Sequence, residues 1–314
     1  MMLLAPMADV TDPAYRKLIA QTGAPAVFWT EFVSADGLYA TREKKKMIDT
    51  ENPLLRDFQF ESSQHPIVAQ IFGSNPDTIA YASQLAATLG FDGIDINMGC
   101  PDKAIERQGA GAGMMKHPED APAIIAAAKE SGLPVSVKTR IGYNKDEIDV
   151  WLSLLLTQDL SALTVHLRTR KEMSLVPAHW ELAPTIVSLR NILAPNTLII
   201  GNGDVETLAG ATKKVEESGM DGVMLGRAIF GNPWLFTDRT YASIAPQEKI
   251  EALRTLSTYF DDLRPKKSFH IMKKHFKAFI KGWEGAGELR ARLMECTTHE
   301  ELLQVLEYKT PLVY

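Results

Sequence analysis

Eight short apolar runs, rich in β-branched residues, alternate with segments of helical spacing along most of this 314-residue chain. Runs that are apolar almost throughout are typical of parallel strands buried on both faces. Polar, glycine-containing residues follow nearly every run, and barrel enzymes build their sites from such strand ends. We therefore predict an α/β fold, a (β/α)8 TIM barrel, although a doubly wound open sheet has the same local pattern. The runs are LLAPM, AVFWTEFV, PIVAQIFG, GIDINMG, VSVKTRIG, ALTVHLRT, TLIIGNGD and GVMLGRA.

The pattern changes after residue 234, where the strand-like runs stop and helical spacing continues from residue 247 to near the end of the chain. A barrel takes roughly 250 residues, so the chain has room for one small additional domain. We predict a barrel domain over 1–245 and a small all-α helical domain over 246–314. Within the barrel, 76–89 and 118–129 have the spacing of helices.

The chain has two cysteines and a net charge of −5, and these values limit which compartments and partners it can have. So few cysteines exclude a disulfide framework, and no run is long enough to span a membrane or to form a signal peptide. We expect a cytoplasmic monomer without a metal site. The negative charge argues against a uniformly basic nucleic-acid binder. Yet residues 247–314 hold 12 Lys+Arg against 10 Asp+Glu, and 264–283 holds seven Lys or Arg, two His and no carboxylate.

Cys100 follows the fourth apolar run, in the sequence NMGCP, and would lie at the catalytic end of a barrel strand. A thiol there can donate a proton, although a lone cysteine is more often a small buried hydrophobic residue. The small-residue segment 108–113 comes next and permits a close backbone approach. This segment is compatible with a mobile loop that closes over a substrate or with a tight turn into the following helix. Cys296, in the helical region, is assigned to packing.

Cationic residues lie at the ends of the fifth and sixth runs. Lys138 is inside a buried run, where a charge needs a partner, and Arg140 shares its strand face. Lys138 is compatible with a buried ion pair to Asp95, with a Schiff-base lysine of an aldolase-like barrel, or with an anionic or electron-rich ligand. A lone histidine is usually a structural residue, but His166, Arg168 and Arg170, spaced by two at a strand end, more often face a phosphate or a polar ring.

Glycine-containing segments end the seventh and eighth runs, at 201–204 and 225–227. In TIM barrels the loops after these two strands commonly bind phosphate through backbone amides. Together they indicate a phosphorylated cofactor. Gln70, at the end of the third run, offers a donor and an acceptor to a flat heterocycle, and is equally compatible with a cap on local backbone.

The sequence resembles the dihydrouridine synthase family over the barrel and into the helical region. The elements NMGCP and HLRTR are the most discriminating when taken together. One departure is Leu167, where many relatives have glycine between the histidine and the arginine. The matching segments are LAPMADVTDPAYR, WTEFVS, VAQIFG, DINMGCPDK, QGAGAGMMK, VKTRIG, VHLRTR, NGDV, GRAIFGNPW and KKHFKAFIKG.

The resemblance implies an FMN-dependent oxidoreductase that reduces specific uridines in transfer RNA to 5,6-dihydrouridine, with NADPH regenerating the flavin. Hydride would pass from the flavin to C6 of a uracil, and Cys100 would deliver a proton to C5 as the general acid. Asn97 and Arg168 are the implied substrate contacts. The implied flavin contacts are Pro6, Met7, Ala8, Gln70, Lys138 and His166 at the ring, and Asn202, Gly203, Asp204, Gly226 and Arg227 near the phosphate.

The carboxylate-free stretch gives the helical domain a role under this resemblance. On a helix, the apolar residues of 269–283 form one stripe with lysines alongside it. Such lysines can be a solvated face, but twenty positions without a carboxylate favour a phosphate-binding surface. A target uridine must leave its stack to enter the barrel, so a domain that grips the RNA backbone is useful. The lysines that we expect to bind transfer RNA are Lys273, Lys274 and Lys277.

Three other functions are compatible with parts of the sequence. An FMN barrel oxidoreductase of a small molecule, similar to dihydroorotate dehydrogenase, would share the phosphate site but would not need the basic helix. A flavin-free aldolase or isomerase would use Lys138. A non-catalytic RNA-binding protein would leave Cys100 unexplained.

Overall fold

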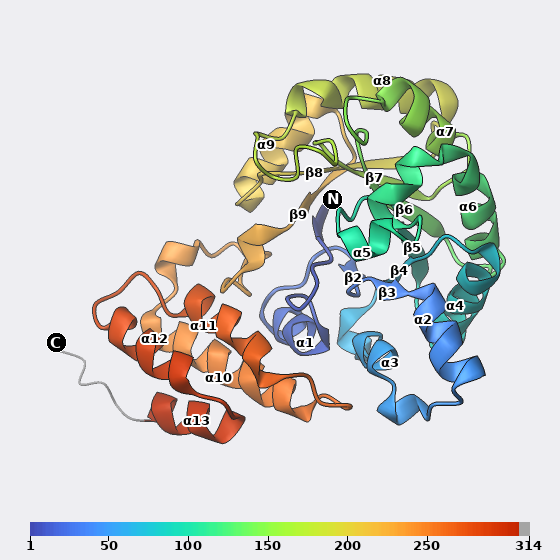
Figure 1. Cartoon of the computed structure of the whole chain (residues 1–314). Helices are drawn as coiled ribbons and strands as arrows, with labels where there is room; N and C mark the ends of the chain where they lie inside the picture. The colour runs from blue at the N-terminus through green and yellow to red at the C-terminus, as the bar shows by residue number, and fades with distance from the viewer. Residues whose placement is uncertain (308–314) are drawn as a thin grey trace.

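A computed structural model of the chain describes residues 1–307 and shows a parallel barrel with a helical region beside it (Figure 1). The strands follow the order β1-β9-β8-β7-β6-β5-β4-β2, and the first strand pairs in parallel with the last. Pairing of β1 with β9 excludes the doubly wound open sheet and confirms the predicted barrel. The strands are β1 (Met2–Leu4), β2 (Phe28–Trp29), β3 (Val33–Ser34), β4 (Ile67–Phe72), β5 (Gly93–Asn97), β6 (Val135–Arg140), β7 (Ala162–His166), β8 (Leu198–Asn202) and β9 (Gly222–Leu225).

The second predicted run is broken into two short strands, β2 and β3, which both pair with β4. Phe28 pairs with Ile67, but Val33 pairs with Ile71, so β2–β3 contains one residue more than the matching part of β4. An extra residue in one strand is a bulge, which locally bends the strand and changes where its side chains point. The bulge includes Glu31, which is buried.

Helices cover the outside of the barrel, and several begin where a capping side chain precedes proline. Asp12 caps α1 and Asn75 caps α4, each through its side-chain oxygen, with proline at the first helical position. The helices predicted over 76–89 and 118–129 are present as α4 and as a 3-10 turn followed by α6. The helices in this part are α1 (Pro13–Thr22), α2 (Ala35–Tyr39), α3 (Pro53–Asp57), α4 (Pro76–Thr88), α5 (Lys103–Glu106), α6 (Ala121–Lys129), α7 (Ser153–Leu156), α8 (Ala183–Leu193) and α9 (Leu208–Ser218).

Four helices follow the barrel: α10 (Pro246–Asp262), α11 (Met272–Phe279), α12 (Ala286–Glu295) and α13 (His299–Glu307). They lie beside α1 at one side of the barrel in Figure 1. Most of the predicted apolar stripe is buried, and Tyr15 of α1 packs edge-on against Phe279 of α11. The barrel and the helices therefore share one continuous apolar core. Residues 308–314 of the predicted helical domain lie outside the described residues.

Within residues 1–307, no helix has the length and apolar character needed to cross a membrane.

Gly231 lies where the end of the barrel approaches α11 most closely. Its φ is +70°, and a Cβ atom there would lie 2.2 Å from the carbonyl oxygen of Ala278. We expect Gly231→Ala to lower the free energy of unfolding by about 2 kcal/mol, because two backbones must separate and alanine is strained at positive φ. Urea denaturation followed by circular dichroism measures the change. In the control Gly287→Ala, on α12, the added Cβ has no neighbour within 4 Å, so no loss is expected.

Candidate active site

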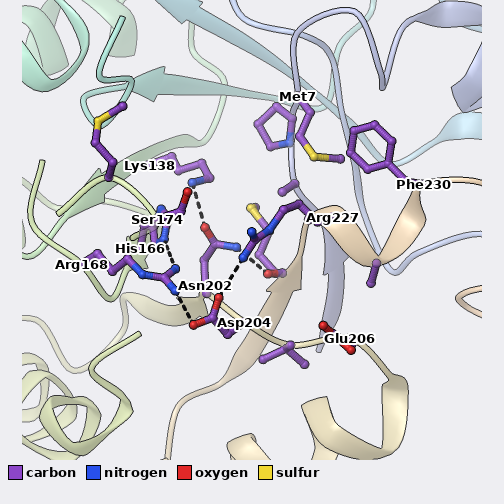
Figure 2. Close-up of a pocket in the computed structure, with 18 of the residues that line it drawn as sticks. Met7, Lys138, His166, Arg168, Ser174, Asn202, Asp204, Glu206, Arg227 and Phe230 are labelled. Carbon is purple, nitrogen blue, oxygen red and sulfur yellow. Dashed lines mark hydrogen bonds and ion pairs between the residues drawn. The ribbon is translucent and has the colours of Figure 1, made fainter. Parts of the chain in front are cut away.

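A cavity of about 620 Å³ opens at the carboxyl ends of β1 and of β6 to β9. Its volume falls within the roughly 300–1,000 Å³ typical of ligand pockets. Figure 2 shows its polar side chains converging from β6, β7 and β8 and from the loops that follow β8 and β9. Ten of the predicted site residues line it: Pro6, Met7, Lys138, His166, Arg168, Asn202, Gly203, Asp204, Gly226 and Arg227.

Lys138 lines this cavity without a carboxylate partner. Its ammonium donates to Asn202 Oδ1 at 3.2 Å, and no ion pair joins it to a carboxylate within residues 1–307. Burial and the nearby Arg140 lower the pKa of Lys138 to about 8. The ion pair with Asp95, considered from the sequence, is absent because Gln70 and Ser136 donate to both Asp95 oxygens, each at 2.6 Å. A cation that lacks a counter-charge suits an anionic or electron-rich ligand.

Gln70 and Asn97 form a hydrogen-bonded chain behind the cavity wall. The Gln70 amide donates to Asp95, and Asn97 Nδ2 donates to Gln70 Oε1 at 3.1 Å. Asn97 Oδ1 then accepts the backbone N–H of Cys100 at 2.9 Å. Neither amide lines the cavity, and the direct ligand contacts of Gln70 and Asn97 stay predictions. Their donors and acceptors instead fix the turn that carries Cys100.

Cys100 packs against the apolar side chains of Phe72, Ile105 and Ala110, and the residue that follows it, Pro101, lines the cavity. The thiol is half-buried, and this burial raises its pKa, so the sulfur holds its proton at neutral pH. Arg140 donates to Gly99 O at 2.8 Å and so holds the same turn from the other side. The charges of Arg140 and Lys138 act on the thiol as well, which places Cys100 within electrostatic reach of the cavity's cations.

The segment 108–113 supports the cysteine turn from below. Ala112 N–H donates to Cys100 O at 2.9 Å, and a Cβ at Gly111, whose φ is +57°, would meet the same oxygen at 2.8 Å. Residues Gly111–Lys116 form a short 3-10 helix that is mostly buried. The interpretation as a mobile loop over the substrate is therefore wrong, because this backbone is packed beneath Cys100.

An alternating chain of charges runs along one wall of the cavity (Figure 2). Arg168 donates to His166 Nε2 at 3.1 Å and to the Asp204 carboxylate, and Arg227 donates to Asp204 at 2.9 Å. Burial and the surrounding cations hold the pKa of His166 well below its usual range, so the imidazole is neutral. Arg168 also donates to Val176 O at 2.6 Å. Since its guanidinium is occupied by protein groups, Arg168 positions its neighbours more than it contacts a substrate.

The loops after β8 and β9 line one end of the cavity and bring their backbone N–H groups to it. Gly203 has a φ of +134°, and a Cβ there would meet the Ala178 side chain at 2.7 Å. At Gly226 a Cβ would lie against Met7, so glycine keeps this part of the cavity open. Arg227 begins a short 3-10 turn, and the first N–H groups of such a turn lack partners within it. This arrangement fits a phosphate group.

The net charge of the cavity lining is positive. Five cationic side chains line it, namely Lys138, Arg140, Arg168, Arg227 and Lys281, against the two carboxylates of Asp204 and Glu206. A carboxylate has no proton to donate, so Asp204 can bind a phosphate only through its backbone N–H. Strong hydrogen bonding from Arg168 lowers the pKa of Asp204 and keeps it ionised.

Some lining residues differ from the sequence predictions. Ala8 is exposed because the chain turns after Met7, whose carbonyl accepts the N–H groups of Val10 and Thr11. Ala5 lines the cavity instead of Ala8. Residues from long connections were also missed, because no local pattern shows that they fold back over the barrel: Met173, Ser174, Phe230 and Tyr241.

The three lysines predicted to bind RNA have different surroundings, and none lines the cavity. Lys273 donates to Met294 O at 2.7 Å, and Lys274 lies 3.7 Å from the Asp9 carboxylate. Lys277 is exposed and makes no ion pair within the described part of the chain. Lys281 belongs to the same carboxylate-free stretch and reaches the cavity itself.

A second basic group lies where the cavity meets the helical region. The ammonium of Lys249 lies 4.1 Å from the ring centroid of Tyr241, and that of Lys281 lies 5.7 Å from the same centroid. Desolvation and Lys281 lower the pKa of Lys249. Two cations around one aromatic ring, beside an open cavity, form a surface that suits an anion.

The position of the cavity places this protein among barrel enzymes that hold a ligand over the carboxyl ends of their strands. No group of three or more potential metal ligands of the His, Cys, Asp or Glu type occurs among residues 1–307. In solved structures, the fold is similar to a 2-naphthoyl-CoA reductase complex, with a TM-score of 0.54, 11% identity, and coverage of 75% of this chain and 49% of that one. It is also similar to 6-hydroxypseudooxynicotine amine oxidase from Pseudomonas geniculata, with a TM-score of 0.51, 10% identity, and coverage of 74% and 46%. These likenesses concern the fold alone.

Sequence comparison identifies the family. The dihydrouridine synthase (Dus) family model matches residues 3–312. A "Probable tRNA-dihydrouridine synthase" of Staphylococcus aureus is 39% identical over 97% of this chain and 92% of its own length. A "Probable tRNA-dihydrouridine synthase 2" of Bacillus subtilis has the same identity and coverage. The chain belongs to the dihydrouridine synthase family and is an oxidoreductase, which excludes the aldolase and the non-catalytic RNA-binding protein.

The carboxylate of Asp204 competes with any anion for Arg168 and Arg227. We expect Asp204→Asn to tighten binding of inorganic phosphate in the cavity by about fivefold, because one negative charge is lost while the acceptor for Ala178 N–H remains. Isothermal titration calorimetry at low ionic strength measures this affinity. Glu206→Gln removes the other lining carboxylate, which is bonded to neither arginine, and is expected to have a smaller effect. Weaker phosphate binding in Asp204→Asn would contradict this electrostatic account.

Proposed function

We propose that this protein reduces uridine in transfer RNA to 5,6-dihydrouridine, with FMN bound in the cavity and NADPH as the reductant. The observation that carries the proposal is a positively charged cavity at the carboxyl ends of the strands, whose lining includes Pro101, the residue directly after a protonated Cys100. Membership of the dihydrouridine synthase family supports this function, as do relatives named for transfer RNA. A dihydroorotate dehydrogenase-like activity is not favoured by any feature of the cavity.

The cavity provides suitable groups for both ends of FMN. We assign the phosphate to the backbone around Gly203 and Gly226 and to the guanidinium of Arg227, whose side chain is 68% exposed and can turn toward an anion. Asn202 and Asp204 border this part. The ring system would lie against Pro6 and Met7, with Lys138 and His166 at its polar edge.

Lys138 has the chemistry needed beside an electron-rich ring. One of its three N–H groups is bonded to Asn202, so others are available to a ligand. Asp95 acts on its charge without forming an ion pair with it. An ammonium in this position stabilises negative charge that develops on the ring. Neutral His166 can donate one hydrogen bond without adding a second charge.

Cys100 is the proposed proton donor. When bound and reduced, FMN supplies a hydride to C6 of the uracil, and the thiol of Cys100 supplies the proton to C5. Together these add two hydrogens across the C5–C6 bond. The raised pKa keeps the thiol protonated beforehand, and the Gln70–Asn97 chain with Arg140 keeps the turn of Cys100 in place. The resulting thiolate then takes a proton from solvent.

The helical region is the proposed site for the RNA backbone. Lys277 is exposed on α11, and Lys249 and Lys281 surround Tyr241 at the junction with the cavity. Phosphates on the exposed Lys277 and Lys281 would hold the strand while one uridine leaves its stack and enters the cavity. Lys273 and Lys274 contribute less to this proposal, because protein groups already occupy their ammonium groups.

The decisive experiment is reduction of transfer RNA that lacks dihydrouridine, by the purified chain with FMN and NADPH. We expect Cys100→Ala to slow formation of dihydrouridine by about 100-fold or more, because a positioned general acid contributes roughly that much. Bound flavin, quantified in the same samples, should be unchanged. Cys296→Ala is the control, since Cys296 is buried in the helical region. An unaltered rate for Cys100→Ala would refute the proton-donor role, and absence of dihydrouridine with the unmodified chain would refute the proposed function.

The surroundings of the lysines also predict how RNA binding should respond to substitution. Lys277→Gln combined with Lys281→Gln should weaken binding of transfer RNA about tenfold and reduce its dependence on salt, because two phosphate contacts are lost. Filter binding at several salt concentrations measures both. Lys273→Gln, one turn away on the same helix, should have little effect, because this lysine is bonded to Met294 O. A larger loss from Lys273→Gln than from the pair would show that another face binds RNA.

A further inference from the structure

Lys267 connects the helical region to the barrel through a buried cluster of carboxylates. It lies between α10 and α11, and its side chain is only 4% exposed. Its ammonium is 2.8 Å from Glu31, 3.4 Å from Asp57, 3.8 Å from Asp12 and 3.9 Å from Asp9. These acids come from three separate segments of the barrel, because Asp9 and Asp12 lie in the same loop before α1. Lys267 belongs to the carboxylate-free stretch 264–283, and its charge is thus balanced by acids of the barrel.

Glu31 links this cluster to the loop that lines the cavity. One of its carboxylate oxygens accepts the N–H of Asp9, and the other accepts the ammonium of Lys267. Asp9 has a φ of +55°, in the left-handed region that few residues other than glycine, Asn and Asp adopt. Met7, two residues earlier, lines the cavity. The bulge between β2 and β3 is the segment that brings Glu31 to this position.

The charge balance of the cluster explains why Lys267 matters. The buried acids Asp12 and Glu31 and the partly buried Asp57 face three cations, Lys267, Arg16 and Arg56, and Arg56 pairs with Asp57 at 3.0 Å. Arg16 is fully buried and also donates to Thr11 O at 2.7 Å. Burial raises the pKa of Glu31 to about 7, against the opposing effect of Lys267. Without Lys267, Arg16 would remain as the cation that acts on the buried Asp12 and Glu31, because Arg56 pairs with Asp57. This loss of positive charge disfavours an ionised Glu31.

We propose that Glu31 and Lys267 are positioning residues that tie the helical region to the cavity loop Pro6–Asp9, so that the element that binds RNA also fixes the wall against which the flavin ring packs. The last part rests on the proposed function, whereas the tie between Lys267 and the loop does not. Neither residue lines the cavity, so each acts through the backbone of Asp9.

The first test measures the loop directly, in the full chain without added cofactor. Hydrogen exchange followed by mass spectrometry on a peptide covering residues 5–11 reports protection of the Asp9 N–H. Lys267→Met should speed this exchange about tenfold, the size expected when a charge-assisted hydrogen bond weakens. Lys266→Met is the matched control, because the neighbouring Lys266 is exposed and pairs with Asp261 within the helical region. Unchanged protection in Lys267→Met would overturn the proposal.

The second test uses FMN affinity, measured by fluorescence quenching well below the unfolding temperature. Lys267→Met should weaken FMN binding about tenfold, and Glu31→Gln should also weaken it. The double variant should bind FMN as Lys267→Met does, because both residues act on one loop. A lower melting temperature with unchanged FMN affinity in these variants would mean a purely structural ion pair and overturn the proposal. Fully additive effects would also overturn it. If Lys267→Met does not fold, Glu31→Gln alone decides between the same outcomes.

The two tests separate failure of this inference from failure of the proposed function. If the unmodified chain binds no FMN, the proposed cofactor is wrong, and the hydrogen-exchange result still decides whether Lys267 holds the loop. If FMN binds normally and neither readout responds to Lys267→Met, the proposed function stands and the positioning role is refuted.

Discussion

Closure of the barrel by β1 against β9 is the constraint on which the site depends. Ala5 N–H donates to Leu225 O at 2.8 Å, directly beyond the last paired residues of the two strands. This contact puts residues 5–7 beside Gly226 and Arg227, more than two hundred positions later in the chain. An open sheet would leave these segments on opposite edges, and the cavity would lack one wall. The ligand site is therefore a product of ring closure as much as of individual side chains.

Much of the fold could be predicted from sequence because burial on both faces leaves a strong local pattern. Apolar runs indicated the strands, and the polar residues at their ends, among them Lys138, His166 and Asn202, line the cavity. The break between β2 and β3 left no such signal, because a single extra residue does not interrupt an apolar run. Residues from long connections, such as Tyr241, were also missed, because their positions depend on tertiary packing, which leaves no local pattern in the sequence.

The sequence does not predict which protein groups the polar side chains of the site contact. Gln70 and Asn97 lie on the expected strands, yet their amides bond to each other and to the cysteine turn. Lys274 and Lys267 come from a stretch without carboxylates, and both find acids in the barrel. Sequence indicates where a charge lies along the chain, but the pairing of charges depends on segments that meet only after folding. Charge-rich stretches near a second domain are therefore weak indicators of a free surface.

Tyr15 packs against His275 and Phe279 on one side of α1, and its hydroxyl donates to Ile229 O at the end of the barrel. The Tyr15 side chain thus links α1, α11 and the end of the barrel, which share one continuous apolar core. Hinge closure of the helices onto the barrel would break this packing. We therefore expect the span between the basic helix and the cavity to stay constant, so that the polynucleotide must distort to bridge it.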